Sequence, residues 1–277
     1  MKARQRDETV RRWAWRASAF RSGPRWSRPN PDTPGRHAMT FPRHDRAALV
    51  WSKMRFLASE TDSAVTVEHA CVVCGEVLEA AGAGLTLATG TGLPEPVFAT
   101  DARSRELEEL QFTLGEGPAL DVSRSGMLVV VTDVTSSEAT LRWPMFAPEA
   151  IDSGVKSIIA VPVQVGAITL GAVGCYREFA GLPSKEGLAK ALVCAEAVIT
   201  LALADTGEPV LGELIDREFT EHRARVYQAA GVVSAQLEIG LPDALARLRA
   251  YAYLNDRKLD EVAEDVVRRR VTFRPES

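Results

Sequence analysis

The spacing of apolar residues predicts three helices in the central part of the chain. Apolar positions recur at helical intervals over residues 46–59 and again over residues 65–81. A longer helix is expected over residues 184–204. Its apolar stripe is formed by Leu188, Ala191, Leu192, Ala195, Val198, Ile199 and Ala202. The stripe indicates that this helix packs one side against a core.

Short runs of β-forming residues lie between these helices. They occupy residues 84–89, 96–100, 127–134, 158–165 and 167–176, with Gly and Pro between them. The last two predict an antiparallel hairpin with Val165-Gly166 as its tight turn. Both alternating sets of side chains in the first strand of this hairpin are apolar, as in a sheet covered on both faces. Helices before and after a mostly antiparallel sheet predict an α+β fold.

The last part of the chain has helical periodicity only. The pattern resumes after Pro209 and continues to Glu238. A second helix is expected after Gly240, which is a tolerable N-cap, and Asn255-Asp256 should end it and cap a third helix over residues 259–269. The three helices predict a small all-α module.

The first helix of this module has apolar residues at near-heptad spacing. They are Phe219, Val226, Val233 and Leu237. A three-helix module does not need all of these positions for its own core. The spacing therefore predicts that two copies of the chain pair as a homodimer, either constitutively or on activation.

Charge divides the chain into three unequal parts. The 277 residues include 37 acidic and 33 basic side chains, and 46% are apolar. Residues 1–38 hold 10 basic and 3 acidic side chains, residues 39–216 hold 12 and 24, and residues 217–277 hold 11 and 10. Because an acidic middle repels polyanions, any nucleic acid is expected to contact the C-terminal part.

Composition also limits the compartment. The most apolar stretch, residues 188–204, contains Lys190 and Glu196, so no membrane span is predicted. Four dispersed cysteines in apolar surroundings do not indicate a disulfide framework. We expect a soluble protein of the reducing cytoplasm.

Residues 1–38 are expected to be a disordered basic extension. They combine arginines with four prolines and three tryptophans and lack periodicity. Arg11-Arg12 is typical of a twin-arginine export signal, but Arg16 and Arg21 interrupt the apolar region that such a signal requires. The segment either contacts RNA through tryptophan and arginine or has no role, with Met39 as the true start, and we favour the second interpretation.

Two cysteines have the spacing of a redox or zinc-binding motif. Cys71 and Cys74 form a CxxC motif, but on a helix both thiols share an apolar face, which favours core packing over a redox pair. A zinc site needs further ligands, and His69 alone does not complete one. No nucleophile elbow or phosphate-binding loop is present. The sequence therefore predicts no catalytic residue and no metal, and it identifies no cofactor.

The α+β part resembles a GAF sensor domain over about residues 45–205. The resemblance rests on Gly-Glu-Gly-Pro at 115–118, on Trp-Pro at 143–144 and on the predicted hairpin. The first two are typical of the actinobacterial type that precedes an RNA-binding module. In this loop Gly115 and Gly117 permit a short helix starting at Pro118, whose backbone N–H groups would face an open space beside the sheet. Candidate ligand-binding residues are Gly115, Gly117, Trp143 and Phe146.

The C-terminal helices resemble the ANTAR domain, over residues 213–272. The family pattern Gln-Ala-x-Gly falls on Gln228, Ala229 and Gly231, with Ala230 where many members have Lys. Its second motif includes Arg249, and its Arg-Lys-Leu falls on Arg257, Lys258 and Leu259. The resemblance implies that the RNA-binding residues are Gln228, Ala229, Gly231, Arg249, Arg257 and Lys258.

Together the two resemblances imply a transcription antitermination regulator. ANTAR proteins bind paired stem-loops with six-nucleotide loops in nascent mRNA, and the GAF part would sense an unknown small molecule, respond to an upstream kinase or dimerise. Two alternatives remain: a GAF-based thiol enzyme of the methionine sulfoxide reductase kind, and a DNA-binding helix-turn-helix factor. The second would need base-reading side chains on the third helix, where Asp260, Glu261 and Glu264 lie instead.

Overall fold

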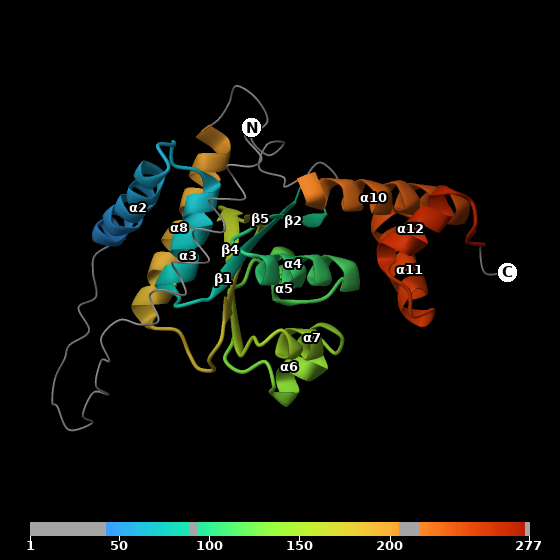
Figure 1. Ribbon diagram of the computed structural model, residues 1–277, viewed down its shortest axis with the longest axis horizontal. Coiled ribbons are helices and arrows are strands. Elements are labelled where there is room, and N and C mark those ends of the chain that lie inside the picture. Colours follow the sequence, from blue (N-terminus) through green and yellow to red (C-terminus); the bar gives the residue numbers. More distant parts are fainter. Residues whose placement is uncertain (1–42, 89–92, 205–216, 275–277) are drawn as a thin grey trace.

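The computed structural model describes residues 43–88, 93–204 and 217–274 (Figure 1). The predicted extension over residues 1–38 and the predicted break at Pro209 lie outside these ranges, as does most of the segment between the two predicted domains. The described residues form a domain built on one β-sheet, here called the sheet domain, and a helical module that follows it.

The sheet has five strands, and every neighbouring pair is antiparallel. The strands are β1 (Gly82–Ala88), β2 (Pro94–Ala99), β3 (Val129–Val131), β4 (Ser157–Val165) and β5 (Ile168–Arg177). Their order is β2-β1-β5-β4-β3. This arrangement confirms the α+β fold predicted from the sequence.

Helices before and after the sheet cover one of its faces. They are α2 (Arg43–Glu60), α3 (Val67–Val77) and α8 (Lys185–Ala204), which lie together in Figure 1. They pack on Ile159, Val161 and Val173 of the central hairpin, all of which are fully buried. All three helices were predicted from apolar spacing, with ends displaced by a few residues.

Four further helices cover the opposite face. They are α4 (Ala102–Leu114), α5 (Pro118–Ser125), α6 (Ser137–Arg142) and α7 (Phe146–Asp152). Here the second set of β4 side chains, Ile158 and Ala160, packs against Phe146 and Tyr176. The expectation that both faces of this strand are apolar and covered is therefore confirmed. Of these helices only the start of α5 at Pro118 was predicted.

The turn of the central hairpin lies one residue later than predicted. Val165 pairs with Ile168, so the turn residues are Gly166 and Ala167. The ladder is irregular between Val163 and Gln164, and this irregularity displaces the register at the end of the hairpin. Gly166 has a φ of 59°, a left-handed conformation that glycine adopts without strain.

The C-terminal module has the three helices that were predicted. They are α10 (Arg217–Leu237), α11 (Leu241–Leu254) and α12 (Leu259–Val267). Gly240 is the N-cap of α11 as expected, but the N-cap of α12 is Lys258 and not Asn255-Asp256. Asp256 has a φ of 49°, so the chain first turns through a left-handed residue before α12 begins.

The helical module uses part of the near-heptad pattern for its own core. Val226 and Val233 are buried among Leu245, Leu248 and Val262 of the neighbouring helices. The backbone of Phe219 belongs to α10, but its side chain is not among those that the structure describes. The buried valines thus no longer support pairing of two copies, and the homodimer stays a prediction that the molar mass in solution tests.

Candidate nucleic-acid interface

Two of the predicted RNA-binding residues lie on the exposed side of α10. Gln228 and Gly231 are exposed, whereas Ala229 between them is fully buried in the core of the module. A Cβ atom added at Gly231 would meet no heavy atom within 4 Å outside its own helical turn. Packing therefore does not require glycine here, although glycine weakens a helix interior. This combination is typical of a position that another backbone approaches closely.

Two further predicted residues precede α12. Lys258 is exposed at the N-cap, where the first backbone N–H groups of the helix favour an anion. Arg257 donates from Nη2 to Asp265 Oδ2 at 2.7 Å. This hydrogen bond lowers the pKa of Asp265, which also pairs with Arg270 at 3.3 Å. Arg257 is thus held beside the helix by a carboxylate, and its RNA-binding role stays a prediction.

The sixth predicted residue, Arg249, lies against the sheet domain. Its Nη2 donates to the carbonyl oxygen of Phe112 on α4, and its guanidinium lies 5.4 Å from the centre of the Phe112 ring. Burial lowers the pKa of Arg249 to about 10. The structure therefore separates Arg249 from the exposed residues of α10 and α12, and its RNA-binding role stays a prediction.

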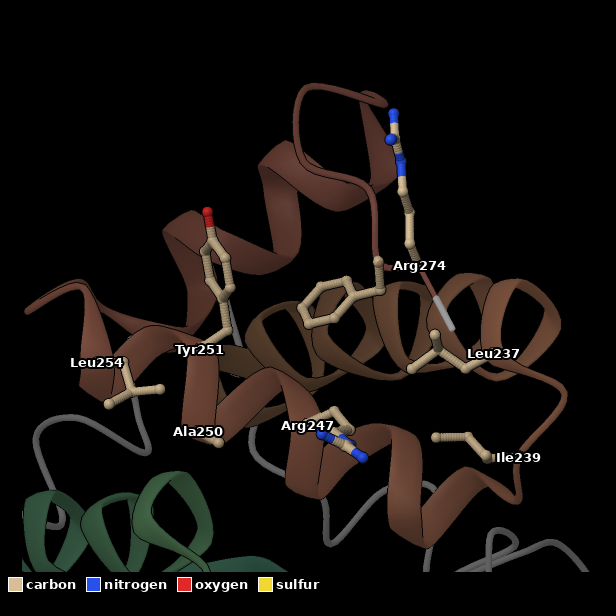
Figure 2. A pocket seen from close by; sticks show the side chains of 8 residues that line it. Leu237, Ile239, Arg247, Ala250, Tyr251, Leu254 and Arg274 are labelled. Carbon is tan, nitrogen blue, oxygen red and sulfur yellow. The ribbon is translucent and has the colours of Figure 1, made fainter. Parts of the chain in front are cut away.

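A hollow of about 390 Å³ on the helical module was not predicted (Figure 2). It is lined by Leu237, Ile239, Arg247, Ala250, Tyr251, Leu254, Phe273 and Arg274. Tyr251 and Phe273 meet edge to face with ring centres 5.4 Å apart, and the Phe273 N–H donates to Gln236 Oε1 at 2.9 Å. Aromatic rings beside arginines are the groups that stack on bases and pair with phosphates. The sequence could have indicated this hollow, because Arg247 and Tyr251 are four residues apart and so lie on one face of α11.

In the sheet domain, the space expected at the start of α5 is filled. The Ala119 N–H of the first turn donates to Gln111 Oε1 at 2.8 Å. A Cβ atom at Gly117 would lie 2.4 Å from Gln111 Cγ, so glycine is needed for this side chain to fit. The expectation of open space was wrong because α4, which was not predicted, places the Gln111 side chain against the Ala119 N–H.

The other candidate ligand-binding residues of this domain have packing roles. Gly115 has a φ of 72° and ends α4. Trp143 and Phe146 are buried in the core on this face, at 3% and 0% exposure. The Trp143 Nε1–H donates to Asp121 Oδ2 at 3.2 Å. Neither the hollow beside Tyr251 nor a second hollow beside Lys53 is lined by these four residues, and their ligand-binding role stays a prediction.

A buried polar cluster on the same face was missed. Thr86 and Tyr176 donate their hydroxyls to the two oxygens of Glu108, each at 2.7 Å, and Gln111 Nε2 donates to the Tyr176 hydroxyl at 3.0 Å. Glu108 is 1% exposed, and its burial raises the pKa of the carboxyl to about 7. The cluster joins α4 to strands β1 and β5.

The four cysteines are buried in the core on the opposite face. Cys71 and Cys74 lie on α3 as predicted, and Cys74 Sγ is 3.8 Å from Cys175 Sγ. Burial raises the pKa of the Cys71 thiol well above its usual value. A thiol in this state is a poor nucleophile, so these residues give no support to the thiol-enzyme alternative.

In the described ranges, no group of three or more His, Cys, Asp and Glu side chains is arranged to hold a metal ion. Within the same ranges, every helix is too short or too polar to cross a membrane.

Comparison with known proteins assigns the helical module. The family model of the ANTAR domain matches residues 217–267, which run from the start of α10 to the end of α12. Comparison with curated proteins gives no match. The C-terminal helices therefore carry an ANTAR domain, as their resemblance implied.

Solved structures resemble the sheet domain at low identity. The GAF domain of a phosphoenolpyruvate-protein phosphotransferase from Coxiella burnetii is 17% identical, with a TM-score of 0.43, over 56% of this chain and 93% of that one. The corresponding Acinetobacter domain is 14% identical, with a TM-score of 0.41, over 58% and 96%. A free methionine-R-sulfoxide reductase from Thermoplasma acidophilum is 13% identical, with a TM-score of 0.31, over 57% and 93%.

The strand order and the helices on both faces agree with the predicted fold class. The chain has an antiparallel sheet flanked by helices, followed by an all-α module with the ANTAR match.

Proposed function

We propose that this protein is an RNA-binding transcription antitermination regulator. The ANTAR module would bind paired stem-loops in nascent mRNA and so prevent a terminator from forming, while the GAF-type domain would receive a signal. The observation that carries the proposal is the ANTAR match, which spans α10 to α12 and so coincides with a complete helical module.

The surface of the module supports the proposal. Exposed Gly231 offers a place for close approach of a nucleic-acid backbone, and Lys258 offers a cation at a helix N-terminus. The hollow beside Tyr251 adds an aromatic surface with nearby arginines. These groups suit a single-stranded loop, whose bases and phosphates are both accessible.

The proposal is tested by recovering RNA that crosslinks to the full-length protein in cells and sequencing it. We expect enrichment of transcripts with two neighbouring stem-loops upstream of a terminator. Enrichment of transcripts without paired stem-loops, or recovery of no RNA, would overturn the proposal. An RNA recovered in this way then serves as the labelled probe for binding measurements.

Gly231→Ala should change stability and RNA affinity in opposite directions. Alanine should stabilise α10 by about 0.5 to 1 kcal/mol, because nothing obstructs the added methyl group. If RNA approaches this face closely, the same methyl group should weaken RNA binding about tenfold, or 1.4 kcal/mol. Urea denaturation and fluorescence anisotropy measure the two effects.

A matched control for Gly231→Ala is Ala246→Gly, at an exposed position of α11. It should lower stability by about the same amount and leave RNA affinity unchanged. Unchanged RNA affinity in Gly231→Ala would mean that RNA does not contact this face of α10.

Arg257→Ala should weaken RNA binding by about 1 to 3 kcal/mol, because it removes a phosphate or base contact. The salt dependence of binding should flatten by about 0.7 to 0.9 of a log-log slope unit. Arg268→Ala is the control, since Arg257 and Arg268 each pair with an α12 carboxylate at 2.7 Å but Arg268 lies at the far end of that helix. Equal losses in the two variants would indicate a diffuse basic surface in place of a defined site.

A further inference from the structure

The sheet domain and the helical module meet at the end of α4. Phe112 of α4 is only 3% exposed, and it packs with the core of the helical module and not with either core of the sheet domain. Its ring centre lies 6.0 Å from that of Tyr227 on α10, and Leu93 packs against the same cluster. This contact, here called the α4 contact, joins the two domains through side chains of α4, α10 and Leu93.

Arg249 completes the α4 contact from the side of the module. The Phe112 carbonyl that accepts its hydrogen bond belongs to the last turn of α4, where carbonyl groups have no partner within the helix. Carbonyls at a helix C-terminus carry partial negative charge and attract cations. A Cβ atom at Gly115, the residue that ends α4, would lie 2.9 Å from Arg249 Nη1. The absence of a side chain there lets the guanidinium reach the helix end.

Within the described part of the chain, the buried Arg249 cation has only uncharged partners in this contact, the carbonyl oxygen and the ring of Phe112. Its Nε is buried and finds no hydrogen-bond acceptor among the described residues. Burial lowers the pKa of Arg249, and the nearby Arg124 lowers it further. A buried arginine ordinarily has a carboxylate as its partner. An RNA phosphate is charged and binds a guanidinium through two hydrogen bonds, so it is a stronger partner than one carbonyl oxygen and one ring.

We propose that the end of α4 is an internal docking surface for the ANTAR module, which withholds Arg249 from RNA until the two domains separate. The inference rests on the proposed function, because it assigns a regulatory state to the same RNA-binding site. Apparent RNA affinity is then reduced by the fraction of molecules in which the contact is closed.

Helix α4 also connects the core of the sheet domain to the α4 contact. Glu108 and Gln111 of α4 belong to the buried polar cluster beneath the sheet, and Phe112 points to the helical module. A displacement of α4 caused by rearrangement of that cluster would move Phe112 and the carbonyl that holds Arg249. A structural change in the sheet domain would in this way alter the contact with the helical module.

Phe112→Ala in the full-length chain tests the proposal. It removes the ring that both Tyr227 and Arg249 contact and leaves every cation of the module in place. We expect a larger radius of gyration by small-angle X-ray scattering and about tenfold tighter binding of a labelled two-stem-loop RNA. Phe56→Ala is the matched control, because Phe56 is 64% exposed on α2, outside the α4 contact. It should change neither measurement.

A second variant guards against misfolding of the first. Gly115→Ala places a methyl group against Arg249, and Gly166→Ala introduces the same strain at another left-handed glycine whose Cβ would meet nothing within 4 Å. Only the first should open the molecule and tighten RNA binding. Circular dichroism checks that all four variants are folded.

Arg249→Ala distinguishes release of the arginine from a general opening. In the Phe112→Ala background it should weaken RNA binding about tenfold, whereas in the wild-type background the loss should be several times smaller, because Arg249 is already withheld. Equal losses in the two backgrounds would overturn the proposal.

The remaining outcomes separate the two hypotheses. If Phe112→Ala and Gly115→Ala fail to open the molecule, or open it without tightening RNA binding, the docking proposal is wrong while the proposed function stands. If no variant binds RNA, including those that scattering shows to be open, the proposed function itself is wrong.

Discussion

Raising the pH from 5 to 8 should lower the free energy of unfolding of the wild type by about 2 to 3 kcal/mol more than that of Glu108→Gln. The pKa of the buried Glu108 carboxyl is raised from 4.5 to about 7 in the folded state. Between these two values the folded state binds a proton that the unfolded state lacks. The stabilisation is therefore fully present below pH 4.5 and is lost as the pH rises through 7.

Glutamine removes the titration but keeps the shape of the side chain. Its carbonyl oxygen can accept from Tyr176, and its amide can donate to the Thr86 hydroxyl. Burial also raises the pKa of Tyr176, so that phenol stays neutral throughout this range. Urea denaturation at several pH values measures the difference. Glu106→Gln, at an exposed position of the same helix, should follow the wild type, and a Glu108→Gln variant that does so too would contradict the prediction.

Apolar periodicity was sufficient to predict most of the fold. Helices α3, α8 and α12 bury regular apolar stripes, and β4 is apolar on both faces, so hydropathy alone indicated them. Errors arose where a turn depends on a backbone detail. The register irregularity after Val163 displaced the hairpin turn, and the left-handed Asp256 displaced the start of α12. Neither leaves a trace in the spacing of apolar residues.

Helix α4 was missed because its buried side is partly polar. Ser104, Glu108 and Gln111 are each no more than 2% exposed, and polar residues at these positions interrupt the apolar stripe that a hydropathy pattern needs. Other signals were present: Asp101 caps the helix by accepting from the Ser104 N–H, and Gly115 ends it. Without α4, neither the filled space beside α5 nor the contact with the helical module was foreseeable.

The sequence predicted the position of some residues of the candidate site but not of all of them. Exposure of Gln228, Gly231 and Lys258 follows from helical periodicity, and so does the burial of Ala229. The position of Arg249 does not, because its partner is a backbone carbonyl 137 residues earlier in the chain. Such a contact depends on how two domains meet, which the local sequence of either one does not specify.

The largest functional loss is expected for Leu248→Ala. Leu248 is fully buried at the centre of α11, and removing such a side chain typically costs 2 to 5 kcal/mol. A core of this size rarely supplies more than about 3 to 5 kcal/mol, so most of the module should unfold at 25 °C. RNA affinity should fall at least about a hundredfold, which corresponds to 2.7 kcal/mol.

Tyr253→Ala is the control in the same helix, because Tyr253 is 64% exposed, does not line the hollow beside Tyr251, and its truncation should change stability by less than about 0.5 kcal/mol. All five tryptophans precede residue 144, so tryptophan fluorescence reports on the sheet domain and the residues before it, while far-ultraviolet circular dichroism also detects loss of α10 to α12. Unfolding of the module with native fluorescence and lost RNA binding would place the RNA site in the module. Full RNA affinity in an unfolded Leu248→Ala module would move that site elsewhere, with the basic segment of residues 1–38 as the first candidate.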